Sequence, residues 1–333
     1  MRQRTVTPPL ESTAQPEAGR RSHRRLLIAF AFAFVTVGLT FLLGRRLTNT
    51  SWPLERAHMD LVGGAVGLYF ASYVLRALGW QKLFPAAGRP GRSRCLTACG
   101  AAAASGVILP FRLDYVVKIA TLKRMPGIKL GLEAIALSII SLGLVDAVAF
   151  LPLSISATAA TSSSFRVPLL LVVLFGFGAC GLLVAGRHVV ALPFVARRAR
   201  LFKLLERIAS RPGATVRDAI LAWAFLLGCW TTRATGSMLL LAALGAGFSP
   251  TLALIVLCLA AAASLIPITS GGAIANVGAT AAVLLALGVD RQRAINFGLA
   301  SGLLLATTAA AAAVVGLAAS AAITRRTLAR APA

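Results

Sequence analysis

Two arginines lie inside long apolar stretches of the chain, where a charged side chain is costly. Arg76 and Arg233 are the only basic residues within segments that we expect to cross a membrane completely. On insertion scales, an arginine at the centre of a bilayer costs about 2.5–3.5 kcal/mol, so each one needs a compensating partner. Either side chain could instead extend to the membrane surface. The functional interpretation is that both arginines bind an anionic group.

Further cations and exposed backbone follow the prolines that end two shorter apolar stretches, 95–109 and 251–266. Arg112 and Lys118 follow the first proline, and Gly271 and Gly272 follow the second. A helix broken within the membrane leaves N–H groups unpaired at the start of its second half, and these groups attract anions. A packing kink is the alternative. The predicted anion-binding residues are therefore Arg76, Arg112, Lys118, Arg233, Gly271 and Gly272.

Two acidic residues, Asp114 and Asp146, accompany these cations. Asp146 lies near the middle of a predicted span, so it could form an ion pair with Arg76 or Arg233. It could equally carry a proton that drives transport. The sequence does not separate these two roles.

Residues with enzymatic potential are few. Glu55 and Asp60 in a predicted outer loop are the candidates for a membrane-embedded glycosyl or lipid transferase, although they also suit a solvated turn. No Gly-Lys-Ser/Thr phosphate loop occurs, and the three histidines fall in predicted tails and loops. We therefore expect no catalytic residue, no metal and no cofactor, and favour a protein that is not an enzyme.

The composition indicates a membrane protein. Apolar residues make up 58% of the 333 residues, charged residues make up 13%, and the mean hydropathy is +0.82. Soluble domains carry about 25% charged residues, so an ordinary cytosolic enzyme is excluded. The net charge of +24 would suit nucleic-acid binding, but the cations alternate with long uncharged runs and so indicate membrane orientation. The five cysteines lie in apolar stretches and are interpreted as packing residues.

The fold class predicted from these runs is an all-α integral membrane protein with six full transmembrane helices plus two re-entrant helical hairpins. Each full span is long enough for a hydrocarbon core of about 30 Å. The hairpins cover 95–122 and 251–288. The six expected crossings are 26–43, 61–80, 131–157, 167–186, 219–243 and 294–323.

The distribution of positive charge predicts the orientation. With the hairpins returning to their side of origin, 26 of the 34 Lys and Arg residues face the cytoplasm and 6 face outward. Both termini are then cytoplasmic, in the cell (cytoplasmic) membrane. The expected segments are a disordered tail (1–25), a membrane domain (26–323) and a short tail (324–333).

The two halves of the membrane domain, 26–157 and 167–323, have the same order of elements but start on opposite sides. Matching residues support an inverted-topology repeat. Arg76 precedes a glycine by 12 residues and Pro110 by 34, and Arg233 precedes a glycine and Pro267 by the same intervals.

Residues 110–118 read Pro-Phe-Arg-Leu-Asp-Tyr-Val-Val-Lys and 267–272 read Pro-Ile-Thr-Ser-Gly-Gly. They resemble the "Pro-x-Arg-x-Gly-Glu-x-x-Arg" and "Pro-x-Thr-Pro-Gly-Gly-x-Gly-x-x-Glu" segments of the lysylphosphatidylglycerol synthase/flippase transmembrane family. The later Leu-Gly-Val at 287–289 also matches, and the resemblance covers most of 26–323. The chain departs from the family pattern at Asp114, Tyr115, Lys118, Ser270, Ile274 and Val277. Both family carboxylates are thus missing, although Asp114 could replace one.

The resemblance implies a role with membrane lipids. Our first hypothesis is translocation (flipping) of an anionic lipid, either a phospholipid or a polyprenyl-phosphate-linked precursor. The alternatives are a membrane-embedded transferase and a non-transporting partner of a lipid-modifying synthase. Aminoacyl-transferring members carry a separate soluble domain. Because the chain ends ten residues after its last predicted span, we expect it not to perform that transfer alone.

Overall fold

The structure is a computed structural model that describes residues 52–107, 109, 113–125, 128, 130–161, 165–190, 215–265 and 272–329. These residues form nine α-helices and one short 3-10 helix, and they contain no strand. The helices are α2 (Met59–Lys82), η1 (Ala86–Gly88), α3 (Arg92–Gly106), α4 (Asp114–Arg124), α5 (Leu132–Ala159), α6 (Arg166–Val190), α9 (Val216–Ala243), α10 (Pro250–Leu265), α11 (Gly272–Ala286) and α12 (Arg291–Ala329).

Four of the described helices have the length and apolar composition of membrane spans. They comprise Met59–Lys82, Leu132–Ala159, Arg166–Val184 and Arg291–Ile323. These four correspond to predicted crossings, and their composition is that of a multi-pass membrane protein. The predicted crossing 219–243 is also helical, as part of the 28-residue α9 that contains Arg233. The predicted crossing 26–43 and the tail 1–25 lie outside the described residues.

The two stretches predicted as re-entrant are each divided into two short helices. The pair α3 and α4 has 15 and 11 residues, and the pair α10 and α11 has 16 and 15. At 1.5 Å per residue these helices are about 16–24 Å long, which is less than a hydrocarbon core of about 30 Å. Within each pair the two helices pack against each other.

Capping residues explain where several helices begin and end. Thr215 caps α9, because its side-chain oxygen accepts a hydrogen bond from the Asp218 amide at 3.2 Å. Asp290 caps α12 in the same way through two amides, at 3.0 and 3.2 Å. Gly245 and Gly288 follow the ends of α9 and α11 with φ of 73° and 83°, a left-handed conformation that favours glycine.

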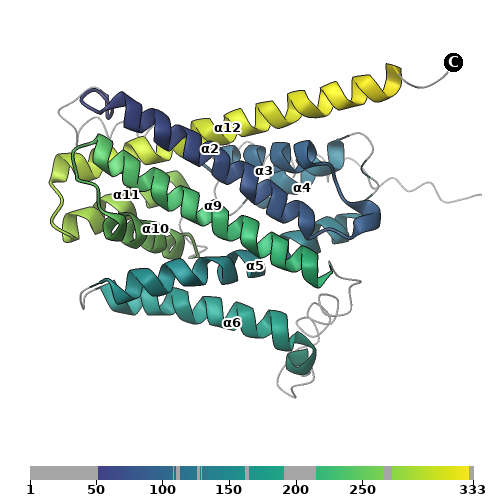
Figure 1. Ribbon diagram of the computed structural model, residues 1–333, viewed down its shortest axis with the longest axis horizontal. Helices are drawn as coiled ribbons and strands as arrows, with labels where there is room; N and C mark the ends of the chain where they lie inside the picture. Colours follow the sequence, from purple (N-terminus) through teal and green to yellow (C-terminus); the bar gives the residue numbers. More distant parts are fainter. Residues whose placement is uncertain are drawn as a thin grey trace, which may run out of the picture.

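Helices α2 and α9 lie side by side and run in opposite directions (Figure 1). Glycines allow them to approach closely. A Cβ atom on Gly79 would lie 3.1 Å from Leu226, and one on Gly236 would lie 3.0 Å from Tyr69. The residue numbers rise along one helix as they fall along the other, so the contact is antiparallel along its length.

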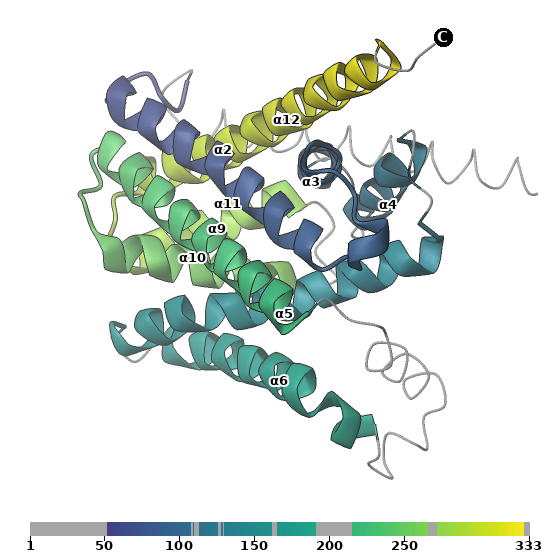
Figure 2. The same ribbon diagram turned by 45° about the vertical axis from the view of Figure 1, so that its right-hand side comes forward.

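The remaining helices lie behind this pair and beside it (Figures 1 and 2). Helix α3 packs against α2 and α12, while α10 packs against α9 and α5. Helices α5 and α6 form a layer on one side, and α12 extends along the opposite side (Figure 2). The largest completely buried side chains are aromatic, including Trp80, Tyr69, Phe84 and Phe297. They belong to two apolar clusters that are built around α2 and α9.

Candidate functional site

A partly buried ion pair joins α2 to α5. The Arg76 Nη2 atom lies 2.7 Å from Oδ2 of Asp146. The other carboxylate oxygen of Asp146 accepts a hydrogen bond from Trp230 Nε1 of α9, at 2.8 Å. Of the two partners considered for Asp146, the structure thus selects Arg76. The Arg76 guanidinium is neutralised inside the helix bundle rather than extended to the surface.

Arg233, on α9, has a different environment. Its Nε atom donates to Ser72 Oγ at 3.1 Å, and its Cζ atom lies 5.1 Å from the centroid of the Tyr73 ring and 5.5 Å from that of Trp230. Aromatic faces stabilise a cation without neutralising it. Among the described residues, no carboxylate forms an ion pair with Arg233, and its two terminal nitrogens have no hydrogen-bond partner. Four N–H donors are therefore available to a ligand.

Lys118 is the third cation, and unlike the partly buried Arg76 and Arg233 it is buried. The residue is only 5% exposed, and its ammonium lies 4.1 Å from the centroid of the Trp80 ring. Trp80 is itself fixed by a hydrogen bond from Nε1 to Ser138 Oγ, at 3.1 Å. Within the described part of the chain, no carboxylate lies at ion-pair distance from Lys118. The sequence predicted Lys118 as an anion-binding residue that follows Pro110, and its side chain is buried in the bundle.

We call Arg76, Lys118, Arg233 and Asp146 the cationic cluster. Its members are linked, because the Arg76 and Arg233 guanidinium groups both face the Trp230 ring, at 6.0 and 5.5 Å. Lys118 lies against Trp80, which is about one helical turn from Arg76 on α2. Three cations and one carboxylate leave two positive charges that no described side chain neutralises. Unpaired positive charge is energetically unfavourable in an environment of low dielectric constant, and binding of an anionic ligand would lower this free-energy cost.

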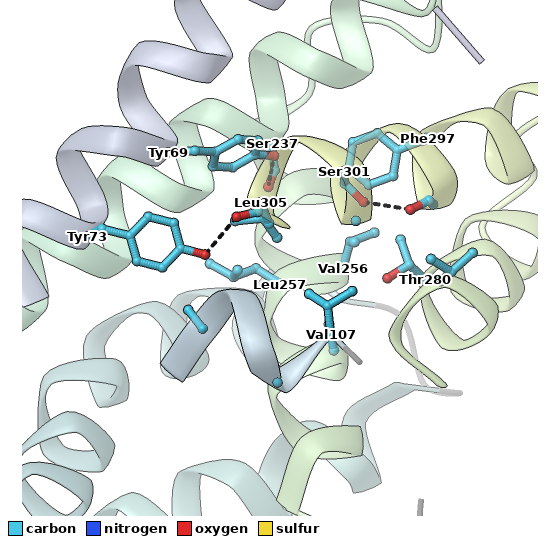
Figure 3. A pocket seen from close by; sticks show the side chains of 16 residues that line it. Tyr69, Tyr73, Val107, Ser237, Val256, Leu257, Thr280, Phe297, Ser301 and Leu305 are labelled. Carbon is cyan, nitrogen blue, oxygen red and sulfur yellow. Dashed lines mark hydrogen bonds between the residues drawn. The ribbon is translucent and has the colours of Figure 1, made fainter. Parts of the chain in front are cut away.

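An apolar cavity of about 250 Å³ lies beside this cluster. Six helices line it, including α3, α10 and α11 from the two divided stretches (Figure 3). Tyr73 connects the cavity to the cluster. Its ring contacts the Arg233 guanidinium, and its hydroxyl donates a hydrogen bond to the Leu305 carbonyl at 3.1 Å. The Tyr69 hydroxyl and Ser237 are hydrogen-bonded at 3.2 Å, which adds polar atoms to one wall.

The other predicted site residues are distributed as follows. Asp114 is the first residue of α4 and lies against the end of α3, where a Cβ atom on Gly106 would be 3.3 Å from its side chain. Gly272 is the first residue of α11. Arg112 and Gly271 lie outside the described residues. The structure therefore brings together Arg76, Lys118, Arg233 and Asp146 from the predicted set.

The two candidate transferase carboxylates, Glu55 and Asp60, do not join the cluster. Both are exposed, and Asp60 lies in the first turn of α2. Sixteen residues separate Asp60 from Arg76 along this helix, which corresponds to about 24 Å.

The aromatic residues around the cations were not predicted from the sequence. Tyr73 lies three residues before Arg76, and Trp230 lies three residues before Arg233. Arg76 packs on the Trp230 ring, and Arg233 packs on the Tyr73 ring. The matching aromatic-x-x-Arg spacing was the signal in the sequence that could have identified them.

A surface ion network closes one end of the α2–α9 contact. Asp218 in the first turn of α9 lies 2.7 Å from Arg89 Nη2 and 3.4 Å from Lys82 Nζ. The hydrogen bond from Arg89, together with these positive charges, holds the pKa of Asp218 below its usual value. This network fixes the connection between α2 and α3 to the beginning of α9.

These features define a multi-pass helical membrane protein with an internal cationic cluster. The family model of the lysylphosphatidylglycerol synthase TM region matches residues 25–313. The chain belongs to this family, which confirms the resemblance of its two proline segments. No curated protein and no solved structure gives a significant match. Membership connects the chain to the metabolism of membrane phospholipids, and a lipid is accordingly its expected ligand.

Proposed function

We propose that this protein translocates an anionic lipid, or the headgroup of a lipid-linked precursor, between the two leaflets of the membrane. The observation that carries the proposal is the excess of positive charge in the cationic cluster. Arg233 and Lys118 have no carboxylate partner among the described residues, although both lie within the bundle. A phosphate group on a lipid would supply the missing negative charge.

A lipid suits this cluster better than a soluble anion for two reasons. The cavity beside Tyr73 is mostly apolar, and its volume of about 250 Å³ is smaller than a typical site for a whole small molecule, about 300–1,000 Å³. Part of an acyl or prenyl chain would fit there while the phosphate contacts Arg233. Family membership points to the same class of ligand.

An inverted repeat would give the cluster access from either leaflet. An offset of 157 residues relates Arg76 to Arg233, and it also relates Tyr73 to Trp230. The contacts follow the same offset, since Arg76 faces Trp230 at 6.0 Å and Arg233 faces Tyr73 at 5.1 Å. The helix contacts agree as well. In the proposed repeat α3 corresponds to α10 and α12 corresponds to α5, and α3 packs against α12 as α10 packs against α5. These correspondences support two repeats, 26–157 and 167–323.

In the proposed arrangement, six full crossings and two re-entrant hairpins lie in the cytoplasmic membrane, with both termini cytoplasmic. The excess of Lys and Arg on the cytoplasmic side supports it. Reporter fusions test it directly. A reporter at Ser163 is expected outside and one at Arg198 inside, and the opposite pattern would refute the orientation.

A vesicle assay tests translocation. The full chain is reconstituted in phosphatidylcholine vesicles with acyl-labelled phosphatidylglycerol, and a membrane-impermeant quencher reports transfer to the outer leaflet. We expect transfer of phosphatidylglycerol to exceed that of labelled phosphatidylcholine. The variants Arg233→Gln and Lys118→Gln are each expected to slow it about tenfold or more. A charge-assisted hydrogen bond contributes about 1.5–3 kcal/mol, and 1.4 kcal/mol corresponds to a factor of ten.

Lys123→Gln is the matched control, because Lys123 is an exposed cation on the same helix as Lys118. Transfer by this variant is expected to equal that of the unmodified protein. Equal transfer by all three variants at normal abundance would refute the role of the cluster. Absence of transfer by the unmodified chain, with co-purification of a lipid-modifying synthase, would favour an accessory role instead. Loss of activity only in Glu55→Gln or Asp60→Asn would favour a transferase.

A further inference from the structure

The three cations of the cluster are arranged in sequence along α2. Arg233 contacts this helix at Ser72, near the middle of its length, and Lys118 contacts it at Trp80, near its C-terminal end. Arg76 lies between these two contacts. Eight residues separate Ser72 from Trp80, which corresponds to an axial rise of about 12 Å.

The two outer cations contact α2 at positions about two turns apart, and the Arg76–Asp146 pair lies between these positions. Each N–H donor must come within about 3 Å of a phosphate oxygen, and the oxygens of one phosphate are close together. A separate anion at each outer cation therefore fits this arrangement better than one clamp around a single phosphate.

The group between the two outer cations carries no net charge. Arg76 and Asp146 neutralise each other at 2.7 Å, and the second oxygen of Asp146 is occupied by Trp230 Nε1. An anion that approaches Arg76 would have to compete with this carboxylate. An anion at Lys118 or Arg233 meets no such competition from the described residues.

We propose that Lys118 and Arg233 form two successive anion sites, separated by the neutral Arg76–Asp146 pair. Each site would take one phosphate of a lipid headgroup, with the Trp80 ring beneath the first cation and the Tyr73 and Trp230 rings beside the second. The headgroup would then cross the bundle in two steps. This inference rests on the proposed function, because it takes the ligand to be a lipid phosphate.

Counting bound ligands tests the inference. The full chain in detergent is titrated with dihexanoyl phosphatidylglycerol, and non-denaturing mass spectrometry counts the bound molecules. A parallel titration with dihexanoyl phosphatidylcholine measures binding that does not depend on negative charge. We expect two bound phosphatidylglycerol molecules above this background, one in Lys118→Gln, one in Arg233→Gln and none in the double variant. A single bound molecule that either variant abolishes would overturn the two-site arrangement.

Charge-conserving variants protect the test against loss of folding. Lys118→Arg and Arg233→Lys keep a cation at each position, so both are expected to retain two bound molecules. If these folded variants also bind only one, the cation is not what forms the site, and the proposal is wrong. Lys123→Gln again serves as the control and is expected to bind two.

Inorganic phosphate separates the two sources of the anion. If inorganic phosphate fills both positions as tightly as the lipid, the ligand is a free anion, and the lipid part of the inference fails. The outcome is independent of the transfer assay. Two bound lipids without transfer would support the sites and refute translocation, whereas transfer with one bound lipid would support translocation and refute the two sites.

Discussion

Replacement of Asp146 by asparagine is the most informative test of how the cluster is held together. Asparagine keeps the size of the side chain and an oxygen that can accept from Trp230 Nε1, but it removes the negative charge that lies 2.7 Å from Arg76. The side chains of this pair are only 24% and 13% exposed, so water compensates little for the loss. Removal of one partner from a fully buried ion pair costs about 3–5 kcal/mol, so a smaller loss of stability is expected for this partly buried pair.

The expected loss of stability on replacing Asp146 depends on whether Arg76 is still present. In Asp146→Asn, three cations remain in the cluster without any carboxylate. In the double variant Arg76→Gln/Asp146→Asn, the unpaired guanidinium is removed as well. The double variant is therefore expected to be destabilised by less than the sum of the two single variants, with a coupling free energy of about 2 kcal/mol or more.

The free energy of unfolding can be measured for the unmodified chain and the three variants by titration with a denaturing detergent in mixed micelles, with tryptophan fluorescence as the signal. Ser141→Ala on the same helix is the control, because its hydroxyl donates only to the Leu137 carbonyl of its own helix, at 3.0 Å. Additive effects, within about 0.5 kcal/mol, would show that Arg76 and Asp146 do not depend on each other and would refute the reasoning.

Two further predictions concern the packing of the bundle. Because the pKa of Asp218 is lowered in the folded protein, its ion network stabilises the fold above the ordinary carboxyl pKa of 3.8, and this contribution is lost as the pH falls below that value. The difference in stability between the unmodified chain and Asp218→Asn should thus disappear at low pH, and a difference that persists there would contradict this origin. Gly100→Ala should destabilise the protein by about 1–3 kcal/mol, since its Cβ would lie 2.5 Å from the Ala313 backbone nitrogen of α12. Gly178→Ala, which meets no atom within 4 Å, should leave thermal unfolding nearly unchanged, and equal effects of the two variants would contradict the close approach of α3 and α12.

Much of the helical arrangement could be predicted from the sequence, because membrane spans are encoded in local composition. The apolar runs predicted α2, α5, α6 and α12, and the proline positions predicted the division of 95–122 and 251–288 into shorter helices. These features depend on residues that are neighbours in the chain. The sequence alone is therefore sufficient to predict these helices.

The composition of the cluster was only partly predictable. Arg76, Arg233 and Asp146 stand out because charges are rare inside apolar runs. Which arginine pairs with Asp146 depends on how α2, α5 and α9 pack, and no local pattern encodes that choice. Trp230 and Tyr73 resemble ordinary apolar residues in the sequence, although they provide the surfaces on which the arginines lie.

The burial of Lys118 shows the same limit. Its neighbours Lys123 and Arg124 are exposed, so the sequence presents a basic stretch that is typical of a cytoplasmic loop. The burial arises because α4 packs against α3 and turns this one cation towards Trp80. The sequence set Lys118 apart from these exposed cations by its place after Pro110, but its burial against Trp80 follows only from the tertiary structure.

The central claim is that an anionic headgroup binds inside the bundle at the unpaired cations. The most direct test is an experimental density map of the protein in nanodiscs that contain phosphatidylglycerol. The account predicts phosphate density within hydrogen-bond distance of the terminal nitrogens of Arg233 or of the Lys118 ammonium. Phosphate density confined to the two membrane surfaces, with a protein carboxylate bound to each of these cations, would contradict it.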